Sequence, residues 1–449
     1  MEKLTGFVTE HLNDDTTRLI MTKAKWPEID MELAVNCIES RRKLKGKVQE
    51  WCDEPGLIFP RRLSAEQCSS SATGEFKAKV AENIIRLTSV DQNKGFRLAD
   101  LTGGLGVDSW FFSKKASQVL YCEMLPELCN AAKHNFTVLK ADNITVKNVA
   151  VCNDMEILQV DSNAQNEKEG KEKSSIFQTP SQILADFQPD IVYMDPARRG
   201  EGGKKVFLIE DCTPDVLTLK DEIFKFSRNI FLKLSPMADI TMVCDRLGRT
   251  CREVYVVAAG GECKELLVWM DREWDGEYMI HAVELHKNVE PGRFSFTIAE
   301  EKTATSQPFL TMPRADTTSK EENKEKLYLF EPGKALMKAG AFNLIGQKLE
   351  LEKLGRSTHY YLFTESKVQQ LKQFGKVFQV IRIDSLDKRS LKAAGKDFPR
   401  AEVTARNIPM DTDTLRKKLG VTSGDDAHIF GLKSDALGNL LIICQGVTQ

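Results

Sequence analysis

Short apolar stretches alternate with amphipathic ones from Gly95 to about residue 275, and this alternation restricts the fold more than any other feature of the sequence. Each apolar stretch has the length of a buried strand, and the stretches between them have helical spacing. Such a rhythm is typical of a doubly wound, mainly parallel, Rossmann-like α/β sheet with helices on both faces. The expected strands are RLADLT, QVLYCE, ITVKNVAV, DIVYMDP, NIFLKLSP, REVYVVAA and ELLVWMDR.

We expect further domains before and after this sheet, because 449 residues at roughly 150 residues per domain predict several domains. Helical spacing before the sheet predicts a helical lead-in, and alternating apolar residues after it predict a small strand-rich unit. The polar run ADTTSKEENKEK predicts a linker, and the polar stretch 159–181 a surface loop. We predict a helical region at 1–75, the α/β sheet at 76–275, a ferredoxin-like strand-rich unit with linker at 276–326, and an α+β domain at 327–449.

Composition excludes several classes of protein. Apolar residues make up 41% of the chain and charged residues 29%, as in ordinary globular proteins. No segment approaches the ~20 consecutive apolar residues of a membrane span, and the amino end lacks the apolar core of a signal peptide. The 11 cysteines form neither a CxxC pair nor a cluster with histidine, so we expect reduced thiols and no metal site. These features predict a cytoplasmic protein without a membrane partner.

Charge is distributed unevenly along the chain. Residues 331–449 carry 19 lysines and arginines against 13 aspartates and glutamates, whereas the chain as a whole has a net charge of −2. A basic carboxyl-terminal part favours an anionic partner. An ordinary solvated surface explains the same excess, so the composition leaves both interpretations open.

The segment LADLTGGLGVDSWFF joins an expected strand to an expected helix through a glycine loop. Glycine lets the backbone approach a ligand closely, and the helix start near Val107 presents unpaired N–H groups to it. Glu123 ends the next strand, nineteen residues after Gly104, where its carboxylate can bind both ribose hydroxyls of an adenosine. Asn153 and Asp154 follow the third strand, where they could meet the adenine edge. The predicted cofactor contacts are Asp100, Thr102, Gly103, Gly104, Gly106, Asp108, Glu123, Asn153 and Asp154.

Two details of this loop distinguish between cofactors. A dinucleotide-binding loop has a similar layout, but Ser109 stands where its third glycine would fall. The Asp100 carboxylate would repel a pyrophosphate, whereas a cofactor with a sulfonium and an ammonium tolerates it. The loop therefore favours S-adenosylmethionine over NAD. A purely structural alternative is that Asp100 caps a turn and Glu123 is solvated.

The fourth expected strand ends in the motif Asp195-Pro196-Ala197-Arg198, at the sheet edge where open α/β folds bind ligands. Over residues 76–275 the paired motifs resemble class I methyltransferases, whose members acting on nucleobase amines carry Asp/Asn-Pro-Pro-aromatic here. The resemblance implies that Asp195 accepts a hydrogen bond from the target amine, beside a pocket shaped by Pro196 and Ala197. Arg198 replaces the aromatic residue and could stack on a base or clamp a phosphate. The glycine-rich run RRGEGGKK at 198–205 predicts a flexible lip over the site, with a turn followed by a solvated basic loop as the alternative.

The whole chain resembles a bacterial family of uncharacterised class I methyltransferases with a carboxyl-terminal THUMP-like domain. The matching stretches are EQCSSSATGEFKAK, DLTGGLGVD, YMDPARR, EPGKALMKAGAF and DDAHIFGLK. The DLTGGLGVD loop is also similar to that of bacterial small-subunit ribosomal RNA guanine-N2 methyltransferases. The resemblance implies methylation of a base amine, guanine N2 or adenine N6, in structured ribosomal or transfer RNA.

Several functions remain open on the sequence alone. An RNA-binding protein without catalysis could keep this fold, and a methyltransferase could act on a protein or a small molecule. An NAD-dependent oxidoreductase is disfavoured, since the third glycine and a convincing proton-transfer residue are missing. The plausible phosphate contacts of the carboxyl-terminal part are Arg400, Arg406, Lys417, Lys418 and Lys433.

Overall fold

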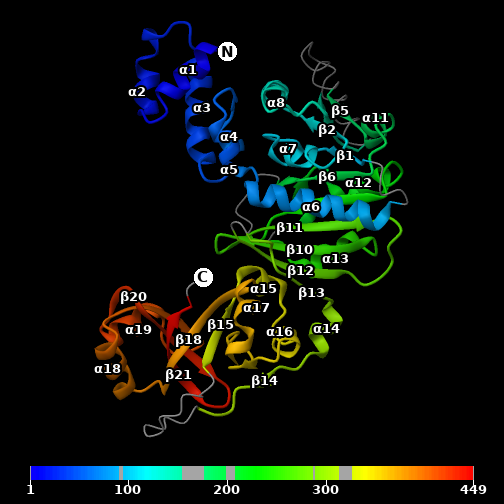
Figure 1. Cartoon of the computed structure of the whole chain (residues 1–449). Coiled ribbons are helices and arrows are strands. Elements are labelled where there is room, and N and C mark those ends of the chain that lie inside the picture. The colour runs from blue at the N-terminus through cyan, green and yellow to red at the C-terminus, as the bar shows by residue number, and fades with distance from the viewer. Residues whose placement is uncertain are drawn as a thin grey trace. The chain divides into compact units, whose positions relative to one another are not determined.

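The computed structural model describes residues 2–89, 95–153, 176–198, 208–286, 289–312 and 326–447, which form two compact units (Figure 1). The first unit consists of Met1–Val254 and Glu265–Tyr278, and the second of Tyr255–Lys264 and Met279–Gln449. Most of the predicted surface loop and of the predicted linker lies outside the described residues. Among the described helices, none combines the length and the apolar character needed to cross a bilayer.

The first unit begins with short helices, as predicted. They are α1 (Glu2–Glu10), α2 (Thr16–Met21), η1 (Lys23–Lys25), α3 (Met31–Leu44), α4 (Gln49–Asp53) and α5 (Arg62–Gln67). Asp15 and Asp30 start α2 and α3, because their side chains accept hydrogen bonds from the first free backbone N–H groups. The inner face of α3 is apolar, and Ala34 and Ile38 on it are fully buried.

A long helix, α6 (Ser71–Thr88), leads from these helices to the central sheet and lies along it in Figure 1. A capping box starts this helix. Its inner face packs closely on α7 (Val107–Ser113), since a Cβ atom at Gly74 would lie 2.2 Å from the ring of Phe111. Glycine is therefore needed at this crossing.

Six neighbouring strands of the central sheet follow the order β11-β9-β6-β1-β2-β3. Their bounds are β1 (Arg97–Asp100), β2 (Gln118–Glu123), β3 (Ile144–Asn148), β6 (Ile191–Met194), β9 (Asn229–Leu234) and β11 (Glu262–Asp271). All of these neighbours pair in parallel except β11, which is antiparallel to β9. β1, β6 and β9 are almost wholly buried, as strands covered on both faces must be. The predicted, mainly parallel sheet is confirmed.

The order of the strands reverses between β1 and β6. From β1 the sheet continues through β2 and β3 on one side and through β6 and β9 on the other. Ligands bind at such a reversal, in the crevice beyond the carboxyl ends of the strands. Asp100 ends β1, and Asp195 directly follows β6. The two motifs that the sequence assigns to cofactor and chemistry are therefore neighbours.

The remaining elements of the first unit connect these strands. The helices are α8 (Pro126–Val138), α11 (Pro180–Leu184), η2 (Ile209–Asp211), α12 (Val216–Ile223) and α13 (Ile240–Leu247). Two pairs of very short strands flank the crevice: β4 (Ala150–Val151) with β5 (Phe177–Gln178), and β7 (Ala197–Arg198) with β8 (Cys212–Thr213). The strand β10 (Cys251–Ala259) precedes β11, and the residues of both are divided between the two units.

The second unit contains an antiparallel pair and a larger sheet. The pair is β12 (Met279–Leu285) with β13 (Arg293–Phe296). The sheet has the order β14-β16-β17-β15-β18-β21-β20-β19. Its strands are β14 (Gln307–Pro308), β15 (Leu327–Pro332), β16 (Glu352–Lys353), β17 (Tyr361–Thr364), β18 (Gly375–Ser385), β19 (Arg400–Arg406), β20 (Thr422–Ser434) and β21 (Gly438–Gly446).

Helices complete the second unit, whose mixture with strands confirms the predicted α+β module. They are α14 (Ile298–Thr303), α15 (Lys334–Ala339), α16 (Leu344–Lys348), η3 (Glu365–Lys367), α17 (Val368–Lys372), α18 (Lys388–Asp397) and α19 (Thr412–Leu419). Along β21, Leu441 and Ile443 enter one apolar cluster, while Leu440 and Ile442 enter another. Because successive strand residues point to opposite faces, this sheet has a core on each side.

Candidate active site

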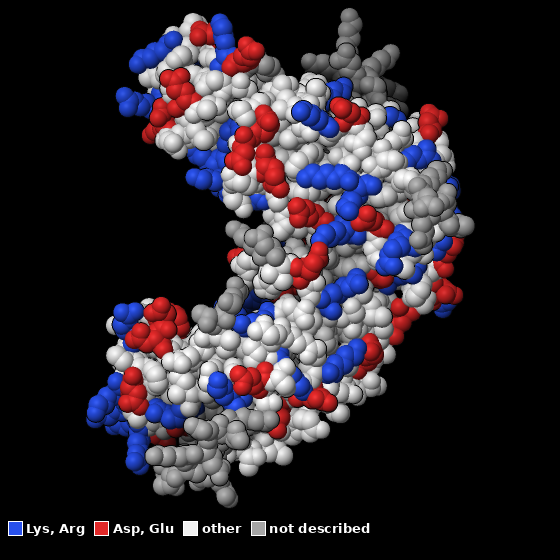
Figure 2. All heavy atoms as spheres, in the orientation of Figure 1, with Lys and Arg blue, Asp and Glu red and all other residues white. Residues whose placement is uncertain are grey.

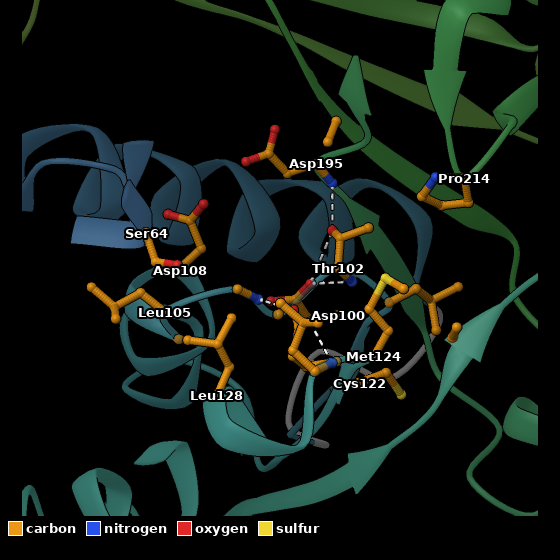
Figure 3. Close-up of a pocket in the computed structure, with 18 of the residues that line it drawn as sticks. Ser64, Asp100, Thr102, Leu105, Asp108, Cys122, Met124, Leu128, Asp195 and Pro214 are labelled. Carbon is orange, nitrogen blue, oxygen red and sulfur yellow. Dashed lines mark hydrogen bonds between the residues drawn. The ribbon is translucent and has the colours of Figure 1, made fainter. Parts of the chain in front are cut away.

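A cavity of about 910 Å³ lies at the carboxyl ends of β1, β2 and β6 in the first unit (Figure 3). Cavities of this size accept cofactor-sized ligands. The predicted site residues that line it are Asp100, Thr102, Gly103, Gly104, Gly106, Asp108, Glu123, Asp195 and Ala197. Apolar side chains line it as well, among them Leu105, Leu125, Leu128, Val151 and Phe177. The fold thus brings both predicted motifs around one space.

The glycine loop between β1 and α7 forms one wall of this cavity. Gly104 and Gly106 have φ angles of 55° and 92°, in the left-handed region that favours glycine. A Cβ atom at Gly103 would lie 2.2 Å from the ring of Tyr121. The Tyr121 hydroxyl donates to the Gly104 carbonyl oxygen at 2.6 Å, so ring and loop are fixed together. The path of the loop therefore requires its glycines.

Asp100 lies beneath the loop with 1% of its surface exposed. Its carboxylate accepts hydrogen bonds from the Ser109 hydroxyl at 2.6 Å and from the Thr102 backbone N–H at 3.0 Å. Burial raises the pKa of Asp100 to about 7; these two bonds oppose the shift, and nearby Asp108 and Asp195 add to it. Asp100 therefore both caps the turn and lines the cavity, where a cationic ligand would favour its ionised form.

Glu123 ends β2 and is 9% exposed, so it is not a solvated surface residue. Its Oε2 accepts a hydrogen bond from the Gly104 N–H at 2.8 Å, and its Oε1 one from the Leu125 N–H at 2.9 Å. Each carboxylate oxygen can accept more than one hydrogen. The two backbone bonds therefore hold Glu123 at the cavity wall without exhausting its capacity to bind hydroxyl groups.

The predicted adenine contacts after the third strand are only partly placed. The Asn153 side-chain amide donates to the Thr218 hydroxyl at 3.4 Å, and Asn153 does not line the cavity, although Cys152 does. Asp154 lies outside the described residues. The assignment of Asn153 and Asp154 to an adenine ring stays a prediction.

The Asp195 carboxylate forms an ion pair that the sequence analysis does not anticipate. The Lys233 Nζ atom, on β9, lies 2.5 Å from Asp195 Oδ2. The Asp195 backbone N–H donates to the Thr102 hydroxyl at 2.6 Å, and that hydroxyl donates to Asp100 at 3.4 Å. Within the described part of the chain, Asp195 Oδ1 has no hydrogen-bond partner, and the side chain is 38% exposed. One carboxylate oxygen is therefore held by Lys233, and the other is available at the cavity.

The residues that follow Asp195 are less completely placed. Pro196 is buried, and Ala197 is exposed and lines the cavity. Arg198 belongs to β7, but its side chain is not among those described. The rest of the predicted glycine-rich lip, residues 199–205, lies outside the described residues. The roles assigned to Pro196, Ala197 and Arg198 stay predictions.

A buried group of charges lies beside the cavity. The Lys77 Nζ atom, on α6, is 3.0 Å from both carboxylate oxygens of Glu265 and 3.2 Å from Asp108 Oδ1. Lys77 also donates to the Ser69 hydroxyl at 2.8 Å, and the Tyr193 hydroxyl donates to Asp108 Oδ2 at 2.8 Å. Desolvated charges are costly unless paired. The two carboxylates therefore depend on Lys77.

Neither Lys77 nor Lys233 is predicted as a site residue, yet the sequence around each one contains a signal that could have identified it. Lys77 falls on the apolar face of its helix, one turn before Val80 and Ala81. Lys233 is the charged residue within the buried strand NIFLKL. Because lysine is almost never fully buried unless paired, such positions predict a buried carboxylate nearby.

Cysteines also line the cavity, namely Cys68, Cys122 and Cys152. Burial raises the pKa of the Cys68 thiol to about 11, and burial raises the pKa of Cys122 even further. A protonated thiol is a poor nucleophile. This chemistry disfavours methyl transfer through a cysteine intermediate. Among the described residues there is no group of side chains that could hold a metal ion.

Family models match the carboxyl-terminal part of the chain in two stretches. Residues 328–370 match a ferredoxin-like domain, and residues 375–446 match a THUMP domain-like family. The THUMP-like module expected from the sequence is confirmed. The ferredoxin-like match begins after the range 276–326 in which the sequence analysis places such a unit. No protein of curated function matches the chain.

A solved structure from Porphyromonas gingivalis resembles the chain over its whole length. This "putative methyltransferase" from Porphyromonas gingivalis W83 is 28% identical, and the match covers 99% of this chain and 98% of that one with a TM-score of 0.75. The N-terminal domain of human METTL16 in complex with SAH is 13% identical over 54% of this chain and 82% of that one, with a TM-score of 0.31. An rRNA methylase from Streptococcus thermophilus is 9% identical over 43% of this chain and 94% of that one, with a TM-score of 0.26. The last two similarities, with TM-scores of 0.31 and 0.26, carry no argument about the chemistry of this chain.

Proposed function

We propose that this chain, which joins a methyltransferase fold to a THUMP-like domain, transfers a methyl group from S-adenosylmethionine to an exocyclic amine of an RNA base. One observation carries the proposal: the glycine loop, Glu123 and Asp195 line a single cavity. The proposed acceptor atoms are guanine N2 and adenine N6, in ribosomal or transfer RNA.

The cavity suits S-adenosylmethionine in size and charge. At about 910 Å³ it lies in the range that encloses cofactors. The carboxylates of Asp100 and Glu123 favour a ligand with a sulfonium and an ammonium group. Glu123 would bind the ribose hydroxyls, and the loop backbone and Leu128 would cover the adenosine. When bound, this cofactor would supply a methyl group whose carbon an acceptor lone pair attacks, while the electron pair of the breaking carbon–sulfur bond stays with the sulfur of the thioether that leaves.

Asp195 would act on the acceptor. Its Oδ1 atom, which has no partner among the described residues, would accept a hydrogen bond from the amine, and this bond would turn the nitrogen lone pair toward the donor methyl group. The carboxylate would also stabilise the positive charge that develops on the nitrogen, and would take the proton that the nitrogen releases. The ion pair with Lys233 keeps the carboxylate in place.

The second unit supports an RNA acceptor. Its THUMP-like stretch includes α18 and α19, whose basic side chains are Lys388, Arg389, Lys392, Lys396, Arg416, Lys417 and Lys418. Figure 2 shows basic side chains gathered over the part of the second unit that α18 forms. Such a surface attracts phosphates, and the attraction weakens as salt is added. RNA binding should therefore weaken steeply with salt.

The test combines cofactor binding with methyl transfer. Asp195→Ala should lose methyl transfer to RNA from cells that lack the gene, while calorimetry shows S-adenosylmethionine bound as tightly as in the wild type. Asp245→Ala, on the exposed face of α13, is the matched control and should retain both. No binding of S-adenosylmethionine would refute the enzymatic function. If the transferred methyl group were found in protein or small molecules instead of RNA, the assignment of RNA as the acceptor would be wrong.

A further inference from the structure

The Lys233 ammonium and the Asp195 carboxylate present hydrogen-bonding atoms to the cavity in a defined order. Both residues line the cavity, and Lys233 Nζ lies 2.5 Å from Asp195 Oδ2. Oδ1 follows on the far side of the same carboxylate. Along the pair, a donor is therefore followed by two acceptors.

This pair has hydrogen-bonding capacity that the described residues do not use. An ammonium has three N–H donors, and in the described part of the chain Lys233 donates only to Asp195. Its side chain is 14% exposed, so solvent reaches it poorly. An unsatisfied donor in such a place costs free energy, which an acceptor atom of a ligand would recover.

The amine of Lys233 stays protonated despite its surroundings. Burial opposes the charge, but the nearby carboxylates of Asp195, Asp108 and Glu265 outweigh burial and raise the pKa of Lys233. Lys233 is thus a permanent donor at neutral pH. It cannot serve as the base that removes a proton from the acceptor.

We propose that this pair selects guanine, by binding the base edge that carries O6, N1–H and the N2 amine. Guanine presents an acceptor and then two donors along this edge, which complements the order of the pair. Lys233 would donate to O6, Asp195 Oδ2 would accept from N1–H, and Oδ1 would accept from N2. This places the amine at the open carboxylate oxygen. The inference rests on the proposed function and reduces its two acceptor atoms to guanine N2.

The other bases fit the pair less well. Adenine offers one amine and one ring acceptor, so Asp195 Oδ1 would stay unpaired. Cytosine carries a ring acceptor, N3, between its amine and O2, so in either orientation of the base an acceptor would face the acceptor Asp195 Oδ2. A site built on hydrogen bonds strongly rejects analogues that leave its buried polar groups unpaired.

The methylated product tests the base assignment without any variant. RNA from cells lacking the gene is incubated with the full-length protein and S-adenosylmethionine, digested to nucleosides and analysed by mass spectrometry. We expect N2-methylguanosine. Methylated adenosine or cytidine would overturn the guanine assignment and leave the methyltransferase function standing. Failure to bind S-adenosylmethionine in calorimetry would overturn the proposed function itself, and the guanine assignment with it.

The contact from Lys233 to O6 is tested with 6-thioguanine, whose sulfur is a weaker acceptor than oxygen. RNA transcripts made with guanosine should be methylated about tenfold to hundredfold faster than transcripts made with 6-thioguanosine. Lys233→Met should lose this preference together with most of the rate, at an unchanged affinity for S-adenosylmethionine. Lys115→Met, which removes an ion-paired lysine outside the cavity, should keep rate and preference.

A merely structural role for Lys233 predicts a different result. If Lys233 only held Asp195 in place, the variant would be slow but would still prefer guanosine over 6-thioguanosine, and the proposal would be wrong. Lys233→Arg keeps N–H donors at this position and should retain part of the preference. Should Lys233→Met prove inactive, a lost preference in Lys233→Arg would overturn the proposal equally.

Discussion

Replacing Lys77 by methionine tests how the site is held together. The change removes the ammonium that contacts Glu265, Asp108 and Ser69, and keeps a long side chain in α6. The two carboxylates would stay buried, at 3% and 12% exposure, without the cation that contacts them both. Removing one partner of a buried ion pair costs about 3–5 kcal/mol. Because Lys77 serves two anions, we expect a loss in the upper half of this range, about a thousandfold in the unfolding equilibrium.

Urea unfolding followed by tryptophan fluorescence measures this loss. All five tryptophans lie in the first unit, so their emission reports the unfolding of that unit alone. Lys115→Met is the control, because its partner Glu82 is exposed and such surface pairs contribute about 0–1 kcal/mol. Adding Glu265→Gln to Lys77→Met should recover part of the loss, since it removes one stranded charge.

The pH dependence of the stability loss in Lys77→Met distinguishes the effect of the unpaired charge from an effect of altered packing. Burial raises the pKa of Glu265 even beside Lys77, and removal of Lys77 should raise it further. A carboxyl group with a raised pKa in the folded state stabilises the fold when protonated and loses that contribution as the pH rises through the raised value. The loss in Lys77→Met should therefore shrink as the pH falls. A loss below about 1 kcal/mol near pH 8, or an equal loss at about pH 5 and pH 8, would refute this account.

Two further predictions concern the glycine loop. Gly103→Ala would push a Cβ atom into the Tyr121 ring, and relieving this clash would cost about 1–3 kcal/mol. Because the loop would shift, calorimetry should show the affinity for S-adenosylmethionine reduced about tenfold. The control is Gly6→Ala, whose added Cβ atom meets nothing within 4 Å and which should bind normally. The pKa of Asp100 is raised to about 7, so its charge, and with it the affinity for this cationic cofactor, should fall as the pH drops below about 7. Asp100→Asn should bind more weakly and without this pH dependence; a pH profile like that of the wild type would contradict the assignment.

Much of the fold could be predicted because its determinants are local in the sequence. Strand length, helical spacing and the glycines after Asp100 locate the sheet and its loop. The carboxyl ends of neighbouring parallel strands meet at one edge, which is why two motifs far apart in sequence could be assigned to one site. Asp100 and Asp195, separated by 95 positions in the sequence, indeed line the same cavity.

The charge pairs could not be predicted, because their partners are distant in sequence. Lys77 and Glu265 are 188 positions apart, and nothing local to either residue specifies the other. Lys233 lies on β9 and Asp195 directly follows the neighbouring strand β6, but their contact depends on the twist and register of the sheet. A sequence pattern can show that a lysine is out of place; only the packed chain shows which carboxylate neutralises it.

The Thr102 hydroxyl connects two parts of the cavity. The hydroxyl accepts a hydrogen bond from the Asp195 backbone N–H and donates one to the Asp100 carboxylate. One side chain therefore connects the residue beneath the glycine loop, where we propose that the methyl donor binds, to the turn after β6, where we propose that the acceptor binds. A ligand that orders the loop also orders this turn, and such coupling acts equally in both directions. We therefore expect positive cooperativity without a fixed order of binding: the methyl donor should strengthen productive docking of the nucleic acid, and the nucleic acid should strengthen binding of the donor by the same factor.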